Sequence, residues 1–172
     1  MTMAPSLRKI TLTAHVTASV GWLGAVGTSL ALGVAGLTLR DSEKVRAVYL
    51  TMEVMGWFVL VPLSFASLLT GLVQSLGTRW GLFRHYWVVV KLGMNVFATT
   101  ILLLYMQTLS YLADLAAETR FNGDLASLRS PSPVVHAAGA LVLLLVAVTL
   151  SVYKPRGMTR YGQRKQPGLP TP

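Results

Sequence analysis

Residues Val134–Tyr153, with the sequence VVHAAGALVLLLVAVTLSVY, contain no lysine, arginine, aspartate or glutamate. A helix needs about 20 apolar residues of this kind to cross the ~30 Å hydrocarbon core of a bilayer. Lipid offers the backbone no hydrogen-bond partner, so a spanning segment must satisfy its own amide groups, as a helix does. The stretch therefore predicts a transmembrane helix.

Three further apolar stretches precede this one, over about residues 10–39, 45–76 and 86–112. The whole chain is 53% hydrophobic and only 12% charged, whereas a soluble domain carries roughly a quarter charged residues. The strict alternation of a barrel strand is absent. The sequence predicts an all-α polytopic membrane protein, with four transmembrane helices in an antiparallel bundle that forms one domain over residues 1–154.

The charges divide between the connections of this bundle. All six carboxylates lie in or beside the first and third connections: Asp41, Glu43, Glu53, Asp114, Glu118 and Asp124. The N-terminal segment, the second connection and the tail carry lysine and arginine without an acid. By the positive-inside rule, we expect a multi-pass protein with both termini in the cytoplasm. The basic tail, residues 155–172, is expected to be disordered or to lie on anionic lipid headgroups.

Composition and motifs argue against several function classes. The net charge of +9 is dispersed over span ends and the tail rather than over a soluble fold, so no nucleic-acid partner is expected. The chain has no cysteine, which excludes disulfides and thiolate metal sites. No phosphate-binding loop, HExxH helix or Ser/His/Asp order is present, so the sequence favours a protein without catalysis. The lipid bilayer is the expected partner, and a homo-oligomer or a second membrane protein remains open.

A few polar side chains lie inside the predicted spans, where they are costly unless they face a protein partner. Glu53 is the one acid well inside a span, and it fits either a functional site or a structural hydrogen bond. Ser67 shares its helix face, which must look inward. Lys91 is close enough to the cytoplasmic boundary for its side chain to snorkel, while Asn95 needs a hydrogen-bond partner on another helix.

Two stripes of residues follow the first span at helical spacing. One is made of small residues, which let another helix approach closely: Thr17, Gly21, Ala25, Ser29 and Gly33. The other lies near the start of the span on roughly the opposite face: Thr11, His15, Ser19 and Trp22. In the second span, Pro62 is expected to kink the helix near mid-membrane.

One hypothesis for these polar residues is a b-type haem site. Helix bundles hold haem b between imidazoles that face one another at similar depth. His15 and His85 both fall in the cytoplasmic half of the predicted bundle, whereas His136 lies toward the other side. His15 and His85 are therefore the candidate haem ligands.

A second hypothesis is a copper site in the outer half, because thioethers and imidazole are suitable copper ligands. Met52 and Met55 are three residues apart on one helical face, and Glu53 and His136 are expected at the same depth. A third hypothesis is a bundle without any cofactor, acting as a membrane partner or assembly factor, in which the polar residues satisfy one another.

Three segments carry a resemblance to known membrane proteins: AHVTASVGWLGAV (Ala14–Val26), VPLSFASLLTGLVQSLGT (Val61–Thr78) and WGLFRHYWVVVK (Trp80–Lys91). Nearly the whole chain to Lys154 resembles an uncharacterised family of small integral membrane proteins common in actinobacteria. This implies a bacterial plasma-membrane location. More loosely, His-x6-Trp-Leu-Gly from His15, Ser-x6-Gly in the second span and Trp-x3-Lys in the third are similar to the membrane domain of CopD copper-resistance proteins. That resemblance implies copper handling, with His15 as the matched histidine, and it places the copper hypothesis ahead of haem.

Overall fold

The computed structural model describes residues 3–78, 81–122 and 128–164. Its helices are α1 (Pro5–Thr38), α2 (Ser42–Met55), the π-helical turn η1 (Gly56–Leu60), α3 (Val61–Leu76), α4 (Tyr86–Asn122), α5 (Ser132–Tyr153) and α6 (Arg160–Arg164). Because α2, η1 and α3 run on without a break, the described part of the chain holds four helices long and apolar enough to cross a membrane. The predicted all-α fold with four spans is confirmed. The third span differs from its prediction only in length, because α4 continues beyond residue 112 to Asn122.

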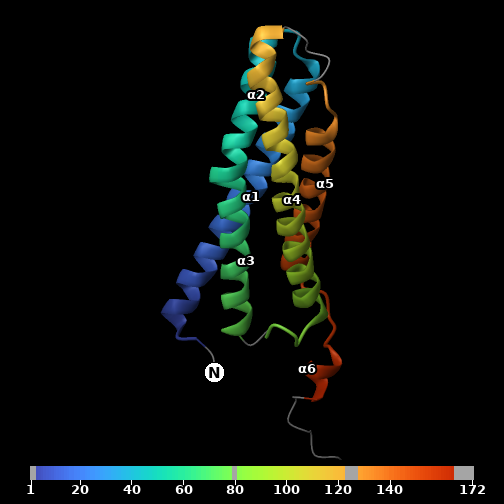
Figure 1. The fold of residues 1–172 in the computed structure, drawn as a ribbon. Helices are drawn as coiled ribbons and strands as arrows, with labels where there is room; N and C mark the ends of the chain where they lie inside the picture. Colours follow the sequence, from blue (N-terminus) through green and yellow to red (C-terminus); the bar gives the residue numbers. More distant parts are fainter. Residues whose placement is uncertain (1–2, 79–80, 123–127, 165–172) are drawn as a thin grey trace, which may run out of the picture.

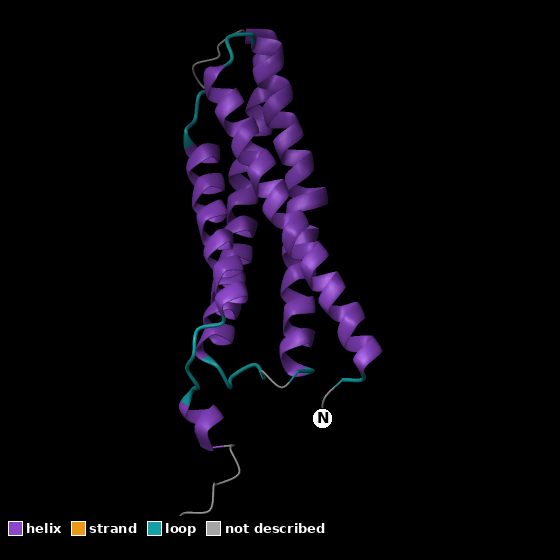
Figure 2. Ribbon diagram, turned by 180° about the vertical axis from the view of Figure 1, so that it is seen from behind, coloured by secondary structure: helices purple, strands orange, loops and turns teal. Residues whose placement is uncertain are grey.

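The four long helices run antiparallel to their neighbours in the chain, as Figures 1 and 2 show. α1 packs against α2, α3 and α5, and α4 packs against the same three helices. In the described residues, no Cα atom of α1 comes within 8 Å of a Cα atom of α4, and the same holds for α2 and α5. α1 and α4 therefore stand at diagonally opposite corners of the bundle.

The two ends of the bundle differ in charge. The end that holds the N-terminus and α6 (Figure 1) is called here the basic end; its described cations are Arg8, Lys9, Arg84, Lys154, Arg156, Arg160 and Arg164. The opposite end is called the acidic end because it holds the described carboxylates Asp41, Glu43, Asp114 and Glu118, although as many cations (Arg40, Lys44, Arg46 and Arg129) lie beside them. The sequence predicts that the basic end is cytoplasmic.

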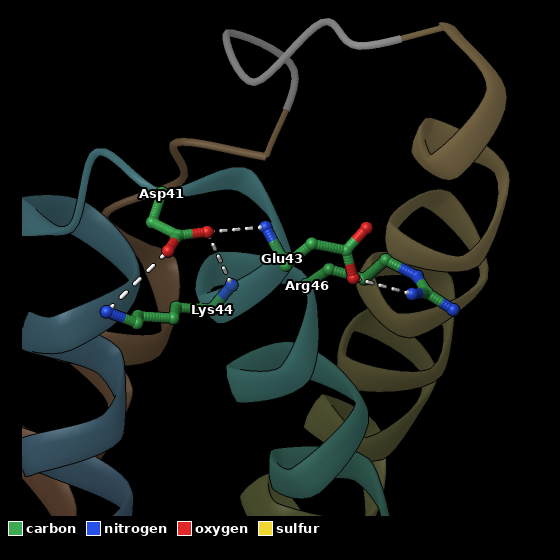
Figure 3. Close-up of polar contacts among 4 residues, drawn as sticks. All are labelled: Asp41, Glu43, Lys44 and Arg46. Atoms are coloured by element: carbon green, nitrogen blue, oxygen red, sulfur yellow. Dashed lines mark hydrogen bonds and ion pairs between the residues drawn. The ribbon is translucent and has the colours of Figure 1, made fainter.

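Asp41 starts α2 at the acidic end. Its carboxylate accepts hydrogen bonds from the backbone N–H groups of Glu43 at 3.0 Å and Lys44 at 3.3 Å (Figure 3). Lys44 also forms an ion pair with Asp41 at 3.6 Å, and Arg46 forms one with Glu43 at 3.3 Å. Exposed ion pairs contribute little, whereas an N-cap of this kind stabilises a helix by about 1 kcal/mol. The cap is therefore the main contribution of Asp41.

The π-helical turn Gly56–Leu60 ends two residues before Pro62 of the second span. Pro62 has no N–H to donate, and a widened turn is one way for the chain to accommodate this loss. Gly56 in the same turn lies against Met106 of α4, since a Cβ atom at Gly56 would come 2.6 Å from Cε of Met106. The glycine therefore allows α4 to approach closely here.

A short helix, α6, lies in the tail that is predicted to be disordered. The backbone N–H of Thr159 donates to the carbonyl of Arg84 at 3.1 Å, and its hydroxyl donates to the carbonyl of Phe83. The same hydroxyl accepts from the backbone N–H of Gly162 in α6 at 3.1 Å. The chain up to residue 164 thus folds back onto the connection before α4, while residues 165–172 of the predicted tail lie outside the described residues.

Candidate functional site

Polar side chains join α1 to α3 in the half of the bundle nearer the basic end. The pairs, from the basic end inward, are Thr11–Gln74 at 2.8 Å, His15–Thr70 at 3.1 Å and Ser19–Ser67 at 2.9 Å. The residue spacing explains why three pairs form in a row. The residues on α1 are four apart, and their partners on α3, which runs in the opposite direction, are four and three apart. Residues at these intervals share one face of a helix. We call these six residues the polar column.

The innermost pair of the polar column also reaches α4. Ser67 is 2% exposed, and the Nδ2 group of Asn95 donates to its hydroxyl oxygen at 3.3 Å. Ser67 therefore connects α1, α3 and α4 at one level. On the same face of α4, the buried atoms Oδ1 of Asn95 and Oγ1 of Thr99 have no hydrogen-bond partner among the described residues.

The hydrogen bonds of Thr70 determine which nitrogen of His15 carries the proton. The hydroxyl of Thr70 lies 2.5 Å from the carbonyl oxygen of Ala66, which can only accept a hydrogen bond. With the hydroxyl proton directed to that carbonyl, the contact between Nδ1 of His15 and Oγ1 of Thr70 is satisfied by the tautomer in which Nδ1–H donates. Nε2 of the neutral ring is then unprotonated, and its lone pair is available to a metal. Metal-binding histidines are commonly oriented in this way, through a hydrogen bond from the other ring nitrogen.

Gly71 makes room for the His15 ring on the face of α3. A Cβ atom at Gly71 would lie 3.0 Å from Cε1 of His15 and 3.4 Å from Nδ1. This is closer than most side chains approach, so a larger residue would displace the imidazole. The glycine and the adjacent threonine together set both the position and the tautomer of His15.

Lys91 lies one helical turn from Asn95 toward the basic end, at the level of His15. The hydrogen bond between Ser67 and Asn95 shows that these two residues are at one depth. Thr70, the partner of His15, lies one turn from Ser67 toward the basic end, just as Lys91 lies one turn from Asn95. The ammonium group of Lys91 donates to the hydroxyl of Ser151 on α5. It also lies 5.8 Å from the ring centroid of Trp87.

His85 lies just before α4, in the same half of the bundle as His15. It is six residues before Lys91, and so about 9 Å nearer the basic end if the helical rise is continued. Its backbone pairs with that of Met158, in the chain segment that leads to α6. Because Lys91 is level with His15, the structure places the two predicted haem ligands in the same half of the bundle but not at the same depth.

His136 belongs to the other half of the bundle. Its Nδ1–H donates to the carbonyl oxygen of Ser132 at 2.9 Å. Its ring stacks on that of Tyr105, with a centroid distance of 3.9 Å and an interplanar angle of 16°. The imidazole is exposed on the surface of the bundle and is oriented by its own helix and by α4.

The structure does not gather the predicted copper ligands on neighbouring helices. Met52, Met55 and Glu53 lie on α2, whereas His136 lies on α5, and within the described ranges no Cα atoms of these two helices come within 8 Å. Met52 is 2% exposed in a cluster with Met106, which is a core position. No group of three or more histidine and carboxylate side chains in the described part of the chain could hold a metal ion. The copper site stays a prediction from the sequence.

Comparisons with known proteins add one similarity. The chain is 29% identical over 115 residues to the haem-binding subunit MsrQ of protein-methionine-sulfoxide reductase from Cronobacter sakazakii. The aligned part is 67% of this chain but only 45% of MsrQ, so the chain spans less than half of that relative. No protein-family model matches the chain, and no solved structure matches it.

Proposed function

We propose that this membrane protein binds b-type haem in the half of the bundle nearest the basic end, with Nε2 of His15 as an axial ligand. The observation that carries the proposal is the hydrogen bond from Nδ1 of His15 to Thr70, because it leaves Nε2 free and holds the ring in place. The similarity to a haem-binding membrane subunit supports the same choice.

The residues around His15 fit such a ligand. Thr70 orients the imidazole, and Gly71 leaves space for the ring where any side chain would crowd it. Four-helix bundles hold cofactors in this way, with ligands that project from facing helices. Haem b, when bound, would supply a one-electron redox centre inside the membrane.

His85 is the residue that would supply a second iron ligand. The chain has three histidines, and His136 lies in the opposite half of the bundle. A site with two imidazole ligands would therefore require His85 and His15 to reach the iron from different depths. A site in which His15 is the one histidine ligand does not need the two imidazoles to bridge this difference in depth. A His85→Ala variant separates the two arrangements, because it removes a ligand only in the first of them.

The test is the absorption spectrum of protein purified in detergent after expression with added haem precursor. The expected result is a Soret band that His15→Ala abolishes and His136→Ala leaves unchanged. The second variant is the matched control, because it removes the other histidine that lies inside a membrane-spanning helix. A colourless wild-type protein, or a His15→Ala protein with an unchanged spectrum, would overturn the proposal.

The charge distribution supports a membrane orientation for this site. We infer that the basic end, and with it the half of the bundle that holds His15, faces the cytoplasm of a bacterial plasma membrane. Lysine and arginine are retained on that side during insertion, and the basic end carries no acid in the sequence.

A further inference from the structure

Lys91 is a cation inside a membrane-spanning helix, and none of the described carboxylates forms an ion pair with it. It is in the second turn of α4, and the described carboxylates belong to the acidic end or to the outer part of α2. The contacts the structure gives its ammonium group are the Ser151 hydroxyl and the ring of Trp87. Neutral groups offset only part of the cost of placing a charge in the membrane, whereas an anion offsets much more.

The position of Lys91 relative to His15 suggests where such an anion would come from. The two residues lie at the same level of the bundle, one turn nearer the basic end than the Ser67–Asn95 hydrogen bond. They stand on α1 and α4, the diagonally opposite corners. His15 is held by α3 on one side, and Lys91 is held by α5 on the other. A ligand between these two corners would lie between an imidazole and an ammonium group.

We propose that Lys91 binds a propionate carboxylate of the haem whose iron is bound by His15. This inference rests on the proposed function. Haem b carries two propionates, and an ammonium group at the same depth as the iron ligand gives one of them an ionic hydrogen bond of the strong, charge-assisted kind. Lys91 would thereby fix the orientation of the porphyrin relative to α4. It is a ligand-binding residue and takes no part in the coordination of iron.

A phosphate of an anionic lipid has the same chemistry and is the other source of an anion at this depth. The two sources differ in one respect that an experiment can use. Esterification of both propionates removes their two negative charges but leaves the iron and the porphyrin ring unchanged. A lipid phosphate is unaffected by that change.

The experiment titrates apoprotein in neutral detergent with haem b and, separately, with haem b dimethyl ester, and follows the Soret band. Wild type, Lys91→Met and Lys91→Arg are compared. We expect Lys91→Met to weaken the binding of haem b by at least about tenfold and to change the binding of the ester less than twofold. Lys91→Arg, which keeps the positive charge, should bind haem b with an affinity between those of wild type and Lys91→Met. The same comparison is then repeated in nanodiscs with and without anionic lipid.

The outcomes separate the inference from the function on which it rests. If wild type binds haem b and Lys91→Met binds it equally well, the propionate contact is wrong and the haem site stands. If Lys91→Met weakens haem b and its ester equally, Lys91 has a structural role instead. An effect of Lys91→Met that appears only in nanodiscs containing anionic lipid assigns the anion to lipid phosphate and overturns the propionate contact. Failure of the wild type to bind either haem overturns both proposals.

Discussion

Nδ1 of His15 lies 3.1 Å from Oγ1 of Thr70, whose hydroxyl is itself bonded to the backbone of Ala66 at 2.5 Å. This chain of two hydrogen bonds has one direction, because a carbonyl oxygen accepts and a hydroxyl has a single proton to give. A residue of α3 thus determines the chemistry of an imidazole on α1. Such partners commonly change the metal affinity of a histidine by 10 to 100-fold when they are removed.

Replacement of Thr70 by valine should weaken haem binding by about tenfold. Valine keeps the shape of the side chain but leaves Nδ1–H of His15 without its acceptor, so the ring loses its fixed orientation. Thr70→Ser keeps the hydroxyl and is the control, with affinity close to that of wild type. Both are measured by Soret titration of the apoprotein. Equal affinities for the valine and serine variants would show that the hydrogen bond does not orient the ligand.

Replacement of Ser67 by alanine should lower the free energy of unfolding in detergent by about 1 kcal/mol, in the range of interhelical hydrogen bonds within membranes. Its hydroxyl is shared by Ser19 and Asn95, and both would lose a partner. Ser75→Ala is the matched control on the same helix, because that hydroxyl donates only to the carbonyl of Gly71 in α3. A loss of stability no larger than that of the control would mean that the connection between three helices contributes nothing.

Replacement of Tyr49 by phenylalanine should destabilise the acidic end by roughly 1–2 kcal/mol. The buried Tyr49 hydroxyl donates to the carbonyl oxygen of Leu128 at 2.5 Å, and this bond ties α2 to the chain segment before α5. Tyr111 is 64% exposed, so Tyr111→Phe removes a hydroxyl without removing such a bond. Thermal unfolding in detergent compares the two variants. A melting temperature for Tyr49→Phe as high as that of Tyr111→Phe would contradict the expectation.

Replacement of Gly162 by alanine should release α6 from the bundle. An added Cβ atom would lie 2.4 Å from the carbonyl oxygen of Arg84, and that backbone atom cannot move aside at low cost. Limited trypsin digestion should then cut more rapidly at Arg160 and Arg164. Gln163→Ala is the control, since its exposed side chain can be removed without a new contact. Equal rates of cleavage in both variants would place α6 off the bundle in solution.

The orientation can be tested with single cysteines, because the natural chain has none. Ser42 lies at the acidic end and Ser6 at the basic end, and both are exposed. A membrane-impermeant maleimide should label Ser42→Cys in intact cells and Ser6→Cys only after permeabilisation. The reverse pattern would show that the positive-inside rule fails for this protein.

The spans could be predicted from the sequence because their signal is local. A run of apolar residues must form a helix in lipid whatever its neighbours are, so the predicted stretches match α1, the continuous helix α2–η1–α3, and α5 closely. The end of α4 was not predictable in this way, because its last turns leave the continuous apolar run and mix apolar with charged and polar residues up to Asn122.

The candidate site was predictable only in part. The stripe Thr11, His15, Ser19 was visible in the sequence at helical spacing, but Thr70 was not singled out as the partner of His15. The sequence feature that could have identified Thr70 is its position three residues after Ser67, which places both residues on one face of α3. Which residues of the small-residue stripe are buried also depends on the neighbouring helices. Ala25, Ser29 and Gly33 are buried, whereas Thr17 is exposed, because the neighbouring helices do not follow one stripe along its whole length.

The sequence by itself determined that this protein has four membrane-spanning helices, and it separated the chain into a basic and an acidic end. Only the tertiary structure decided which polar residues meet. Helices that are apolar on all sides have no strongly preferred rotation in lipid, since every face is equally well solvated there. Their rotation and diagonal order are set by close packing and by a few interhelical hydrogen bonds. Those interactions bring His15 to Thr70 and place Lys91 at its level.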